Sequence, residues 1–350
     1  MDLNNLARHA GEWLRGTGAD SDIVIACRIR LARNVPDFPF ISRCTPAQKN
    51  ELAEILSQKV TAANVGEGAQ YLQLDGLDMV DRIFLVERHL ISKELAENEG
   101  ARGVAFDTRE TVSVMVNEED HLRIQAFHSG FHLEDTWAAI DALDDRIGER
   151  VEYAYSQQLG YLTACPTNVG TGMRASVMLH LPVLGMTRQI EQVVHAVQKM
   201  GLVVRGLYGE GTQASGNLFQ ISNQMTLGKT EIEIVENITS TVPTIVSMER
   251  KARQAMMSQN RDQLEDKVWR SLGLLRSARV INSSETLEHL SHLRLGVNLG
   301  LVDGLDAGTV NQLFILTLPA HLQKIEGRIL EAKQRNVVRA QFIRETLGKT

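Results

Sequence analysis

Cysteine is scarce in this sequence, and its spacing excludes the common structural uses of cysteine. Cys27, Cys44 and Cys165 are odd in number and form neither a C-x-x-C pair nor a Cys/His cluster with the spacing of metal ligands. Disulfides and a structural zinc site are therefore not expected. We expect reduced thiols, as in a cytoplasmic protein.

Long apolar runs are also missing. The first twenty residues mix charged and apolar side chains, so they lack the apolar core of a signal peptide, and no later run approaches the length of a membrane span. The net charge of −6 disfavours nucleic acid as a direct partner. No internal repeat or low-complexity segment occurs, which argues against a solenoid. We predict a cytoplasmic globular protein without a membrane or nucleic-acid partner.

The glycine-rich nucleotide motifs lack their usual context. Residues 170–175 and 209–214 fit the pattern G-x-G-x-x-G/A, but neither is followed by the start of a helix, which a dinucleotide site requires. Residues 228–230 and 348–350 read Gly-Lys-Thr, yet neither has the upstream glycine of a P-loop. A Rossmann fold and a P-loop are therefore not expected.

The stretch that carries the most chemistry runs from Cys165 to Pro182. Its glycine-rich turn, with Gly170 and Gly172, leads to Arg174 at the start of an apolar run that is typical of a buried strand. This arrangement would hold a cation on a rigid scaffold beside exposed backbone amides. It suits a multiply charged anion such as phosphate.

A second candidate for a phosphate-binding strand lies near the start of the chain. Residues 22–33 alternate apolar and polar side chains, which predicts a strand with Arg28 and Arg30 on one face. From this stretch alone, a solvated edge strand and a phosphate-binding face are equally good interpretations.

The remaining pattern predicts strands and helices up to about residue 250 and mainly helices beyond it. Thr45 and Pro46 are an N-cap and a first helical residue. The expected elements are helices over 46–63, 79–97, 132–150 and 187–200, the second with His89 on or near its apolar face and the last capped by Thr187; strands over 71–77, 111–116, 122–127 and 202–206; and C-terminal helices over 254–275, 285–298 and 320–347. For His89, a satisfied core histidine is the commoner explanation.

Arginines begin or end several of these predicted core strands. This arginine cluster comprises Arg28, Arg30, Arg123, Arg174 and Arg205. Phosphoryl transfer depends mostly on positioning and charge neutralisation, which a group of guanidinium ions around a triphosphate supplies. Glu119 and Glu210 lie beside members of the cluster in sequence. We expect the cations to keep these two carboxylates ionised, so that they can hold a positively charged nucleophile.

Four motifs in this order resemble the phosphagen (guanidino) kinase family. They are Arg28-x-Arg30, the segment 117–123 (Asn-Glu-Glu-Asp-His-Leu-Arg), the segment 165–174 (Cys-Pro-Thr-Asn-x-Gly-Thr-Gly-x-Arg), and the pair of Arg205-Gly and Ile221-Ser-Asn223. The resemblance covers roughly residues 21–250. It implies an α+β fold with a large antiparallel sheet flanked by helices, and the use of ATP with Mg²⁺.

The resemblance also implies roles for individual residues. Glu119, Glu210 and Cys165 match catalytic positions, the two glutamates as carboxylates for a substrate guanidinium and the cysteine as a reactive thiol. Cys165 could equally be packed core. No protein side chain is assigned to a metal. The implied nucleotide-binding residues are Ala26, Cys27, Arg28, Ile29, Arg30, His89, Arg123, Arg174, Ala175, Ser176, Val177, Met178, Arg205, Gly206, Leu207, Tyr208, Gly209 and Glu210.

Two departures from the small-molecule kinases favour one branch of the family. Only about twenty residues precede the Arg-x-Arg strand, where the small-molecule kinases carry a substrate-closing helical domain. The helical C-terminal part, with the segment 293–300 (Leu-Arg-Leu-Gly-Val-Asn-Leu-Gly), looks like that of the bacterial protein arginine kinases of the McsB type. The expected organisation is a short segment over 1–20, a catalytic domain over 21–250, and a helical domain over 251–350 for dimerisation and for binding of phosphoarginine and clients.

The resemblance therefore implies phosphorylation of arginine side chains in proteins. The alternatives are a kinase of a free guanidino compound and a catalytically inactive adaptor. The implied partners are a heat-shock repressor and misfolded clients with exposed arginines, a zinc-binding activator protein, a Clp ATPase/protease that degrades marked clients, and a second copy of the chain.

A last motif lies on the predicted C-terminal helix. Arg335 and Arg339 are four residues apart and share one face of the helix. The same place in McsB-type kinases carries Arg-Asp-x-x-Arg-Ala, an allosteric phosphoarginine site, and the matching residues here are Arg335, Asn336, Val337, Val338, Arg339 and Ala340. Because Asn336 replaces the acid, we expect weaker binding of phosphoarginine. A solvated basic face is the alternative.

Overall fold

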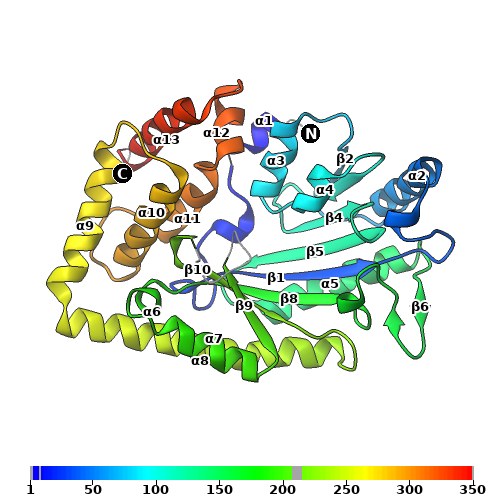
Figure 1. Ribbon diagram of the computed structural model, residues 1–350, viewed down its shortest axis with the longest axis horizontal. Helices are drawn as coiled ribbons and strands as arrows, with labels where there is room; N and C mark the ends of the chain where they lie inside the picture. The colour runs from blue at the N-terminus through cyan, green and yellow to red at the C-terminus, as the bar shows by residue number, and fades with distance from the viewer. Residues whose placement is uncertain (1–2, 8, 207–214, 349–350) are drawn as a thin grey trace.

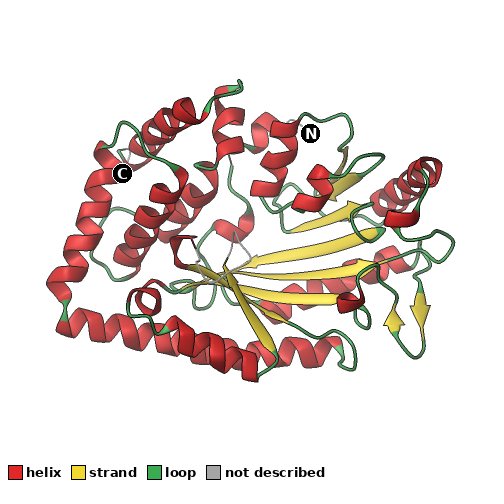
Figure 2. Ribbon diagram, viewed as in Figure 1, coloured by secondary structure: helices red, strands yellow, loops and turns green. Residues whose placement is uncertain are grey.

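The computed structural model describes residues 3–7, 9–206 and 215–348, and its centre is one large antiparallel sheet (Figures 1 and 2). The strands are β1 (Val24–Arg33), β2 (Gln70–Gln73), β3 (Gly103–Phe106), β4 (Val112–Val116), β5 (Leu122–Ser129), β6 (Tyr155–Ser156), β7 (Gly160–Tyr161), β8 (Met173–His180), β9 (Leu202–Gly206) and β10 (Leu218–Asn223). Eight of them form the sheet in the order β2-β3-β4-β5-β1-β8-β10-β9, and β6 and β7 form a separate hairpin.

The helices flank this sheet and fill the C-terminal part of the chain. They are α1 (Leu3–Leu6), α2 (Pro46–Ala62), α3 (Met79–Glu87), α4 (Lys93–Glu97), α5 (Leu133–Gly148), α6 (Pro182–Met186), α7 (Ile190–Lys199), α8 (Glu231–Gln259), α9 (Arg261–Ser277), α10 (Ser283–Asn298), α11 (Ala307–Leu316), α12 (Pro319–Glu326) and α13 (Ala332–Leu347). The predicted α+β architecture is confirmed. None of the described helices is long and apolar enough to cross a membrane.

Local sequence signals explain several of these elements. Thr45 and Gln48 form a reciprocal capping box at the start of α2, and Pro46 occupies its first turn, as predicted. In β1 the burial alternates around Arg28 and Arg30, which are partly exposed between fully buried neighbours. The strand therefore separates a core face from a polar face.

The core face of the sheet packs against α2, α5 and α8. Their buried side chains include Leu52, Ile140 and Ile245, which join one apolar cluster with strand residues such as Ile29 and Val177. A second cluster joins the opposite face to the C-terminal helices, which gather on one side of the sheet in Figure 1. α8 runs without a break across residue 250, the predicted domain boundary.

The predicted helix over residues 79–97 is wrong, because the chain forms two helices there. α3 ends at Glu87, and His89 then adopts a left-handed conformation with φ of 60°. The Leu90 amide donates back to the carbonyl of Leu85, and the Ser92 side chain caps α4. A non-glycine residue in this conformation stops a helix, and neither hydrophobic spacing nor composition reveals it.

Three other boundaries also differ from the prediction. Thr187 does not cap α7; its hydroxyl donates to the Val183 carbonyl and closes α6. The predicted helix over 320–347 is divided at Gly327, which ends α12 with φ of 66°. The predicted helix over 254–275 is divided at Asn260, where α8 ends and α9 begins.

Gly170 allows the closest backbone approach in the turn before β8. It has φ of 110°, and a Cβ placed there would overlap the Thr226 carbonyl oxygen and lie 2.8 Å from Leu227 Cα. Gly228 has φ of 75° but open space around its Cβ position. The two glycines thus share a backbone requirement and differ in packing.

We predict that Gly170→Ala destabilises the protein more than Gly228→Ala does. The positive φ should cost about 1 kcal/mol at either position, and overlap with backbone should add about 1–3 kcal/mol at Gly170 alone. Urea unfolding of the two variants measures the difference. Equal losses would show that the turn moves freely away from the 226–227 segment.

Candidate active site

The arginine cluster lies on one face of the sheet. Arg30 on β1 pairs directly with Arg174 on β8, and the neighbouring Ala32 pairs with Arg123 on β5. Arg28 lies two residues before Arg30 and therefore on the same side. Arg205 extends the cluster from the edge strand β9. Burial lowers the pKa of Arg174, and the nearby Arg205 lowers it further. The structure therefore brings the five predicted arginines together.

These cations lack carboxylate partners at the centre of the cluster. Within the described part of the chain, Arg28, Arg30 and Arg174 form no salt bridge, and the buried Nε of Arg30 has no hydrogen-bond partner. Burial, followed by Arg123 and Arg174, lowers the pKa of Arg28 to about 10. Burial, followed by Arg28, Arg123 and Arg174, lowers the pKa of Arg30 well below its ordinary value. The arrangement fits a polyphosphate, whose oxygens would satisfy these donors.

Arg123 has a partner that the sequence did not single out. Its guanidinium forms a salt bridge with Glu118, which is almost fully buried. Burial alone would raise the pKa of Glu118, but Arg123 and hydrogen bonds from Ser92 and the Glu119 amide bring it below the ordinary value. Glu118 therefore orients Arg123. The turn contains three acids, Glu118, Glu119 and Asp120, and the sequence alone does not show which of them pairs with Arg123.

Glu119 is exposed at the tip of the β4–β5 turn. Burial raises its pKa, the carboxylates of Asp120 and Glu118 raise it further, and Arg123 only partly opposes them. We expected the nearby cations to keep Glu119 ionised, and the structure adds that two acids in the same turn oppose this effect of Arg123. A raised pKa makes this carboxylate a better proton acceptor. Glu210 lies outside the described residues.

Cys165 begins the short helical turn Pro166–Asn168, next to the acid turn. Its Sγ lies 3.0 Å from Thr167 Oγ1, and the residue is partly exposed rather than packed in the core. The preceding Ala164 amide donates to Asp120 Oδ1 at 2.7 Å. A thiolate at Cys165 would lie close enough to Arg174 to raise the pKa of that arginine. The thiol therefore borders both the cations and the acids.

His89 lies beside the arginine cluster rather than on a helix. Burial, with Arg28 and Arg30, lowers its pKa to about 3, so the imidazole is neutral at physiological pH. Its buried Nε2 has no hydrogen-bond partner. Trp13 packs edge-on against it with ring centroids 5.3 Å apart, and Phe127 stacks on Trp13 at 6.0 Å. No motif in the N-terminal segment identified Trp13.

The predicted nucleotide-binding stretches have two sides. Arg28, Arg30, Arg174, Ser176 and Met178 occupy the cluster face, with Ala26 on the same side of β1. The side chains of Cys27, Ile29, Ala175 and Val177 are fully buried in the opposite core. These four residues can therefore offer a nucleotide only backbone atoms. Gly206 ends β9, and Leu207, Tyr208 and Gly209 lie outside the described residues.

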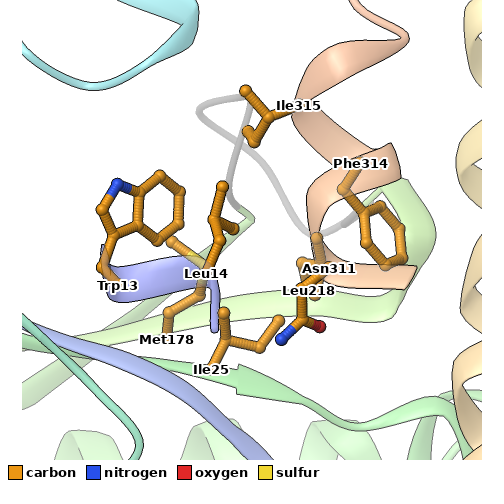
Figure 3. A pocket seen from close by; sticks show the side chains of 8 residues that line it. All are labelled: Trp13, Leu14, Ile25, Met178, Leu218, Asn311, Phe314 and Ile315. Atoms are coloured by element: carbon orange, nitrogen blue, oxygen red, sulfur yellow. The ribbon is translucent and has the colours of Figure 1, made fainter. Parts of the chain in front are cut away.

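A small, mostly apolar pocket lies at the aromatic end of this face (Figure 3). The residues that line it are Trp13, Leu14, Ile25, Met178, Leu218, Asn311, Phe314 and Ile315. The last three belong to α11, so the C-terminal helices contribute to a wall next to the cluster. Asn311 Oδ1 accepts from Arg294, whereas its buried Nδ2 has no partner in the structure.

The second predicted site lies on α13. Arg339 is buried, and it donates to the carbonyls of Thr317 and Ile281 and to Asn336 Oδ1. Arg335 is partly exposed and donates to the Leu330 carbonyl. A fully solvated basic face is therefore excluded for Arg339. Val337 is exposed, Val338 is partly exposed, and Ala340 is buried.

Two comparisons of sequence decide the family. Residues 51–252 match the family described as ATP:guanido phosphotransferase, C-terminal catalytic domain, and residues 261–350 match the protein-arginine kinase McsB C-terminal domain. The protein-arginine kinase of Desulforamulus reducens is 46% identical over 96% of this chain and 95% of its own length. That of Bacillus pumilus is 44% identical over 99% and 96%. This chain belongs to the protein-arginine kinase family.

Solved phosphagen kinases support the same fold for this protein-arginine kinase family member. The duplicated taurocyamine kinase of Schistosoma mansoni matches 67% of this chain and 34% of its own, with 30% identity and a TM-score of 0.61. A lombricine kinase matches 72% of this chain and 71% of its own, with 26% identity and a TM-score of 0.58.

In the described residues, no group of three or more His, Cys, Asp or Glu side chains could hold a metal ion.

We predict that Arg30→Met makes the protein more stable without nucleotide and less responsive to it. Replacing an unpaired, partly desolvated cation by an apolar chain should stabilise the fold by about 1 kcal/mol. ATP should raise the melting temperature of the parent protein more than that of the variant, as thermal unfolding would show.

Arg33→Met is the matched control, because Arg33 is buried and paired with Asp144 at 2.6 Å. This change leaves a buried carboxylate alone and should cost about 3–5 kcal/mol. If Arg30→Met also destabilised the protein by several kcal/mol, the positive charge of Arg30 would have a compensating partner in the folded protein, which contradicts the description of the cluster.

Proposed function

We propose that this chain transfers the γ-phosphoryl group of ATP to arginine side chains in proteins. The observation that carries the proposal is an arginine cluster whose central members, Arg28, Arg30 and Arg174, form no salt bridge among the described residues, bordered by an exposed acid, Glu119, that suits a guanidinium. The relatives named protein-arginine kinase match nearly the whole chain, including its C-terminal helices. This match favours a protein acceptor over a free guanidino compound.

The triphosphate would lie across β1, β5 and β8. Arg28, Arg30 and Arg174 would donate to its oxygens, and Arg123, oriented by Glu118, would do so from β5. Mg²⁺ bound to the phosphates would neutralise further charge on the oxygens. The neutral His89 ring, with Trp13 behind it, offers a surface on which a purine can stack.

Glu119 and Glu210 would hold the acceptor guanidinium by charge-assisted hydrogen bonds. As a guanidinium nitrogen attacks the γ-phosphorus, an N–P bond forms and the bond to the β-phosphate oxygen breaks, which releases ADP. One carboxylate accepts the proton that the nitrogen loses, because a guanidinium with its pKa above about 12 does not release it unaided. Cys165, beside Thr167, would lie at the edge of this acceptor position.

The cofactor, location, assembly, regulation and partners rest on family resemblance alone. We propose Mg²⁺ as the nucleotide's metal, a cytoplasmic location, a homodimer, allosteric control by phosphoarginine, and a role in the stress response. The proposed partners are a heat-shock repressor that is inactivated, misfolded clients that are marked for a Clp protease, and a zinc-binding activator protein. An inactive adaptor is disfavoured because the described motif residues are intact and assembled.

The acid and the arginines should have separable roles at the site. Glu119→Gln should lower kcat at least about 100-fold and leave ATP affinity unchanged, because the acid serves the acceptor. The same effect is expected of Glu210→Gln. Arg174→Ala should weaken ATP binding by about 10-fold to 100-fold, because it removes charged hydrogen bonds to phosphate. Mass spectrometry of an arginine-containing protein incubated with ATP and Mg²⁺, with calorimetry of ATP binding, measures both.

The pH dependence gives a further check on the same residues. A base acts when deprotonated, so the rate should fall as pH drops through the raised pKa of Glu119. Phosphate on free arginine but never on protein would contradict the proposed acceptor. Loss of ATP affinity in Glu119→Gln as severe as in Arg174→Ala would contradict the division of roles.

Binding of phosphoarginine on α13 should depend on Asn336 and Arg335. Asn336→Asp should strengthen binding of free phosphoarginine about tenfold, because a carboxylate holds a guanidinium better than an amide does. Arg335→Ala should remove binding, and Arg328→Ala, which changes an exposed arginine nearby, should not. Calorimetry with phosphoarginine measures all three. Binding by Arg335→Ala as strong as by the parent protein would contradict the site.

Arg339→Ala is informative only with a stability measurement. Its three hydrogen-bond acceptors are buried or half-buried, so this change should also lower the melting temperature. Arg335 is the cleaner position because its side chain is partly exposed.

A further inference from the structure

We propose that four apolar side chains beside the acceptor end of the site bind apolar residues that flank the target arginine in an extended polypeptide. We call them the rim surface: Tyr155, Leu159, Met225 and Leu227. Their exposed fractions are 60%, 46%, 58% and 47%. Contiguous exposed apolar surface marks interaction sites on proteins. The inference rests on the proposed function.

The rim surface is built from two segments held against a third. Tyr155 and Leu159 belong to the β6–β7 hairpin, which stands apart from the main sheet in Figure 1. Met225 and Leu227 follow β10. The segment 165–170 lies between them: the Tyr161 amide donates to the Gly170 carbonyl at 2.7 Å, and Thr226 Oγ1 donates to the carbonyls of Thr167 and Val169.

These segments approach one another closely through backbone. A Cβ at Gly160 would lie 2.5 Å from the Gly170 carbonyl oxygen, and a Cβ at Gly170 would meet Thr226 and Leu227 backbone. Among the rim side chains, Tyr155 also packs edge-on against Tyr161 with ring centroids 5.3 Å apart, and all four remain exposed.

The same scaffold holds the acceptor end of the site. The Asp120 carboxylate accepts from the Ala164 amide and from Asn34 Nδ2, and the same Asn34 nitrogen also donates to the Leu162 carbonyl. Glu119 directly precedes Asp120, and Cys165 directly follows Ala164. The rim surface is therefore fixed relative to the proposed acceptor carboxylate.

A polypeptide segment fits this surface better than a small acceptor does. The target arginine must place its guanidinium at Glu119 while its backbone stays one side-chain length away. An extended chain advances about 3.3 Å per residue, so side chains within about three positions of the arginine pass over the neighbouring rim. Apolar flanking residues would bury surface against Leu159 and Leu227. A free guanidino compound has no flanking residues that could contact the rim surface.

The test compares two peptides of equal length and charge, each with one arginine. One carries Leu and Phe within three positions of the arginine, and the other carries Ser and Gly. The double variant Tyr155→Ser, Leu159→Ser and the single variant Leu227→Ser should raise KM for the apolar peptide about tenfold, which corresponds to about 1.4 kcal/mol. KM for the polar peptide and for ATP should not change.

Ile329→Ser and Val280→Ser are matched controls, since both residues are exposed apolar side chains, at 80% and 61%, in the C-terminal part. Neither should alter either KM. Melting temperatures confirm that each variant is folded.

Five outcomes contradict the inference. The rim variants could leave both values of KM unchanged, or raise both equally, which would indicate general damage. Light scattering could instead show that they disrupt assembly while KM stays unchanged, which would make the surface an interface between copies of this chain. If the parent protein phosphorylates both peptides with equal KM, the docking surface is wrong but the proposed function stands. If it phosphorylates neither, the function fails, and the docking surface with it.

Discussion

Uncompensated positive charge on one face of the sheet is the constraint on which the rest of the site depends. Arg30 and Arg174 face each other across paired strands, and burial together with neighbouring arginines lowers the pKa of each. The fold tolerates this repulsion because the opposite face of the same strands packs a continuous apolar core. His89 is neutral beside the cluster because burial, and then Arg28 and Arg30, disfavour its protonation.

Other buried arginines show that the cluster is not a general property of this chain. Arg33 pairs with Asp144, Arg88 with Glu110 and Arg253 with Glu249. Each of these buried cations has a carboxylate, as desolvated charges usually require. The buried Arg294 and Arg339 form no salt bridge among the described residues, but they donate to backbone carbonyls and to Asn side chains. Arg28, Arg30 and Arg174 form no salt bridge within the described residues. The difference is best explained by an anion that arrives from solution.

The sequence predicts what depends on local patterns and misses what depends on tertiary placement. Alternation around Arg28 and Arg30 placed both on one strand face, and Thr45 with Pro46 placed the start of α2. His89 was misplaced because a left-handed residue in the middle of a periodic apolar stretch leaves no compositional signal. Trp13 was missed because its ring partners, His89 and Phe127, are distant in sequence. The raised pKa of Glu119 depends on its burial and on where the turn places the two adjacent acids, neither of which the sequence shows.

Measuring how affinity depends on phosphate number tests the central claim most directly. Calorimetric titration of the purified protein with ATP, ADP and AMP at one fixed salt concentration would compare ligands with the same base and sugar. If the arginine cluster carries the binding energy, affinity should fall steeply from ATP to ADP to AMP, because each phosphate lost removes contacts with Arg28, Arg30 and Arg174. Equal affinity for AMP and ATP would contradict the account.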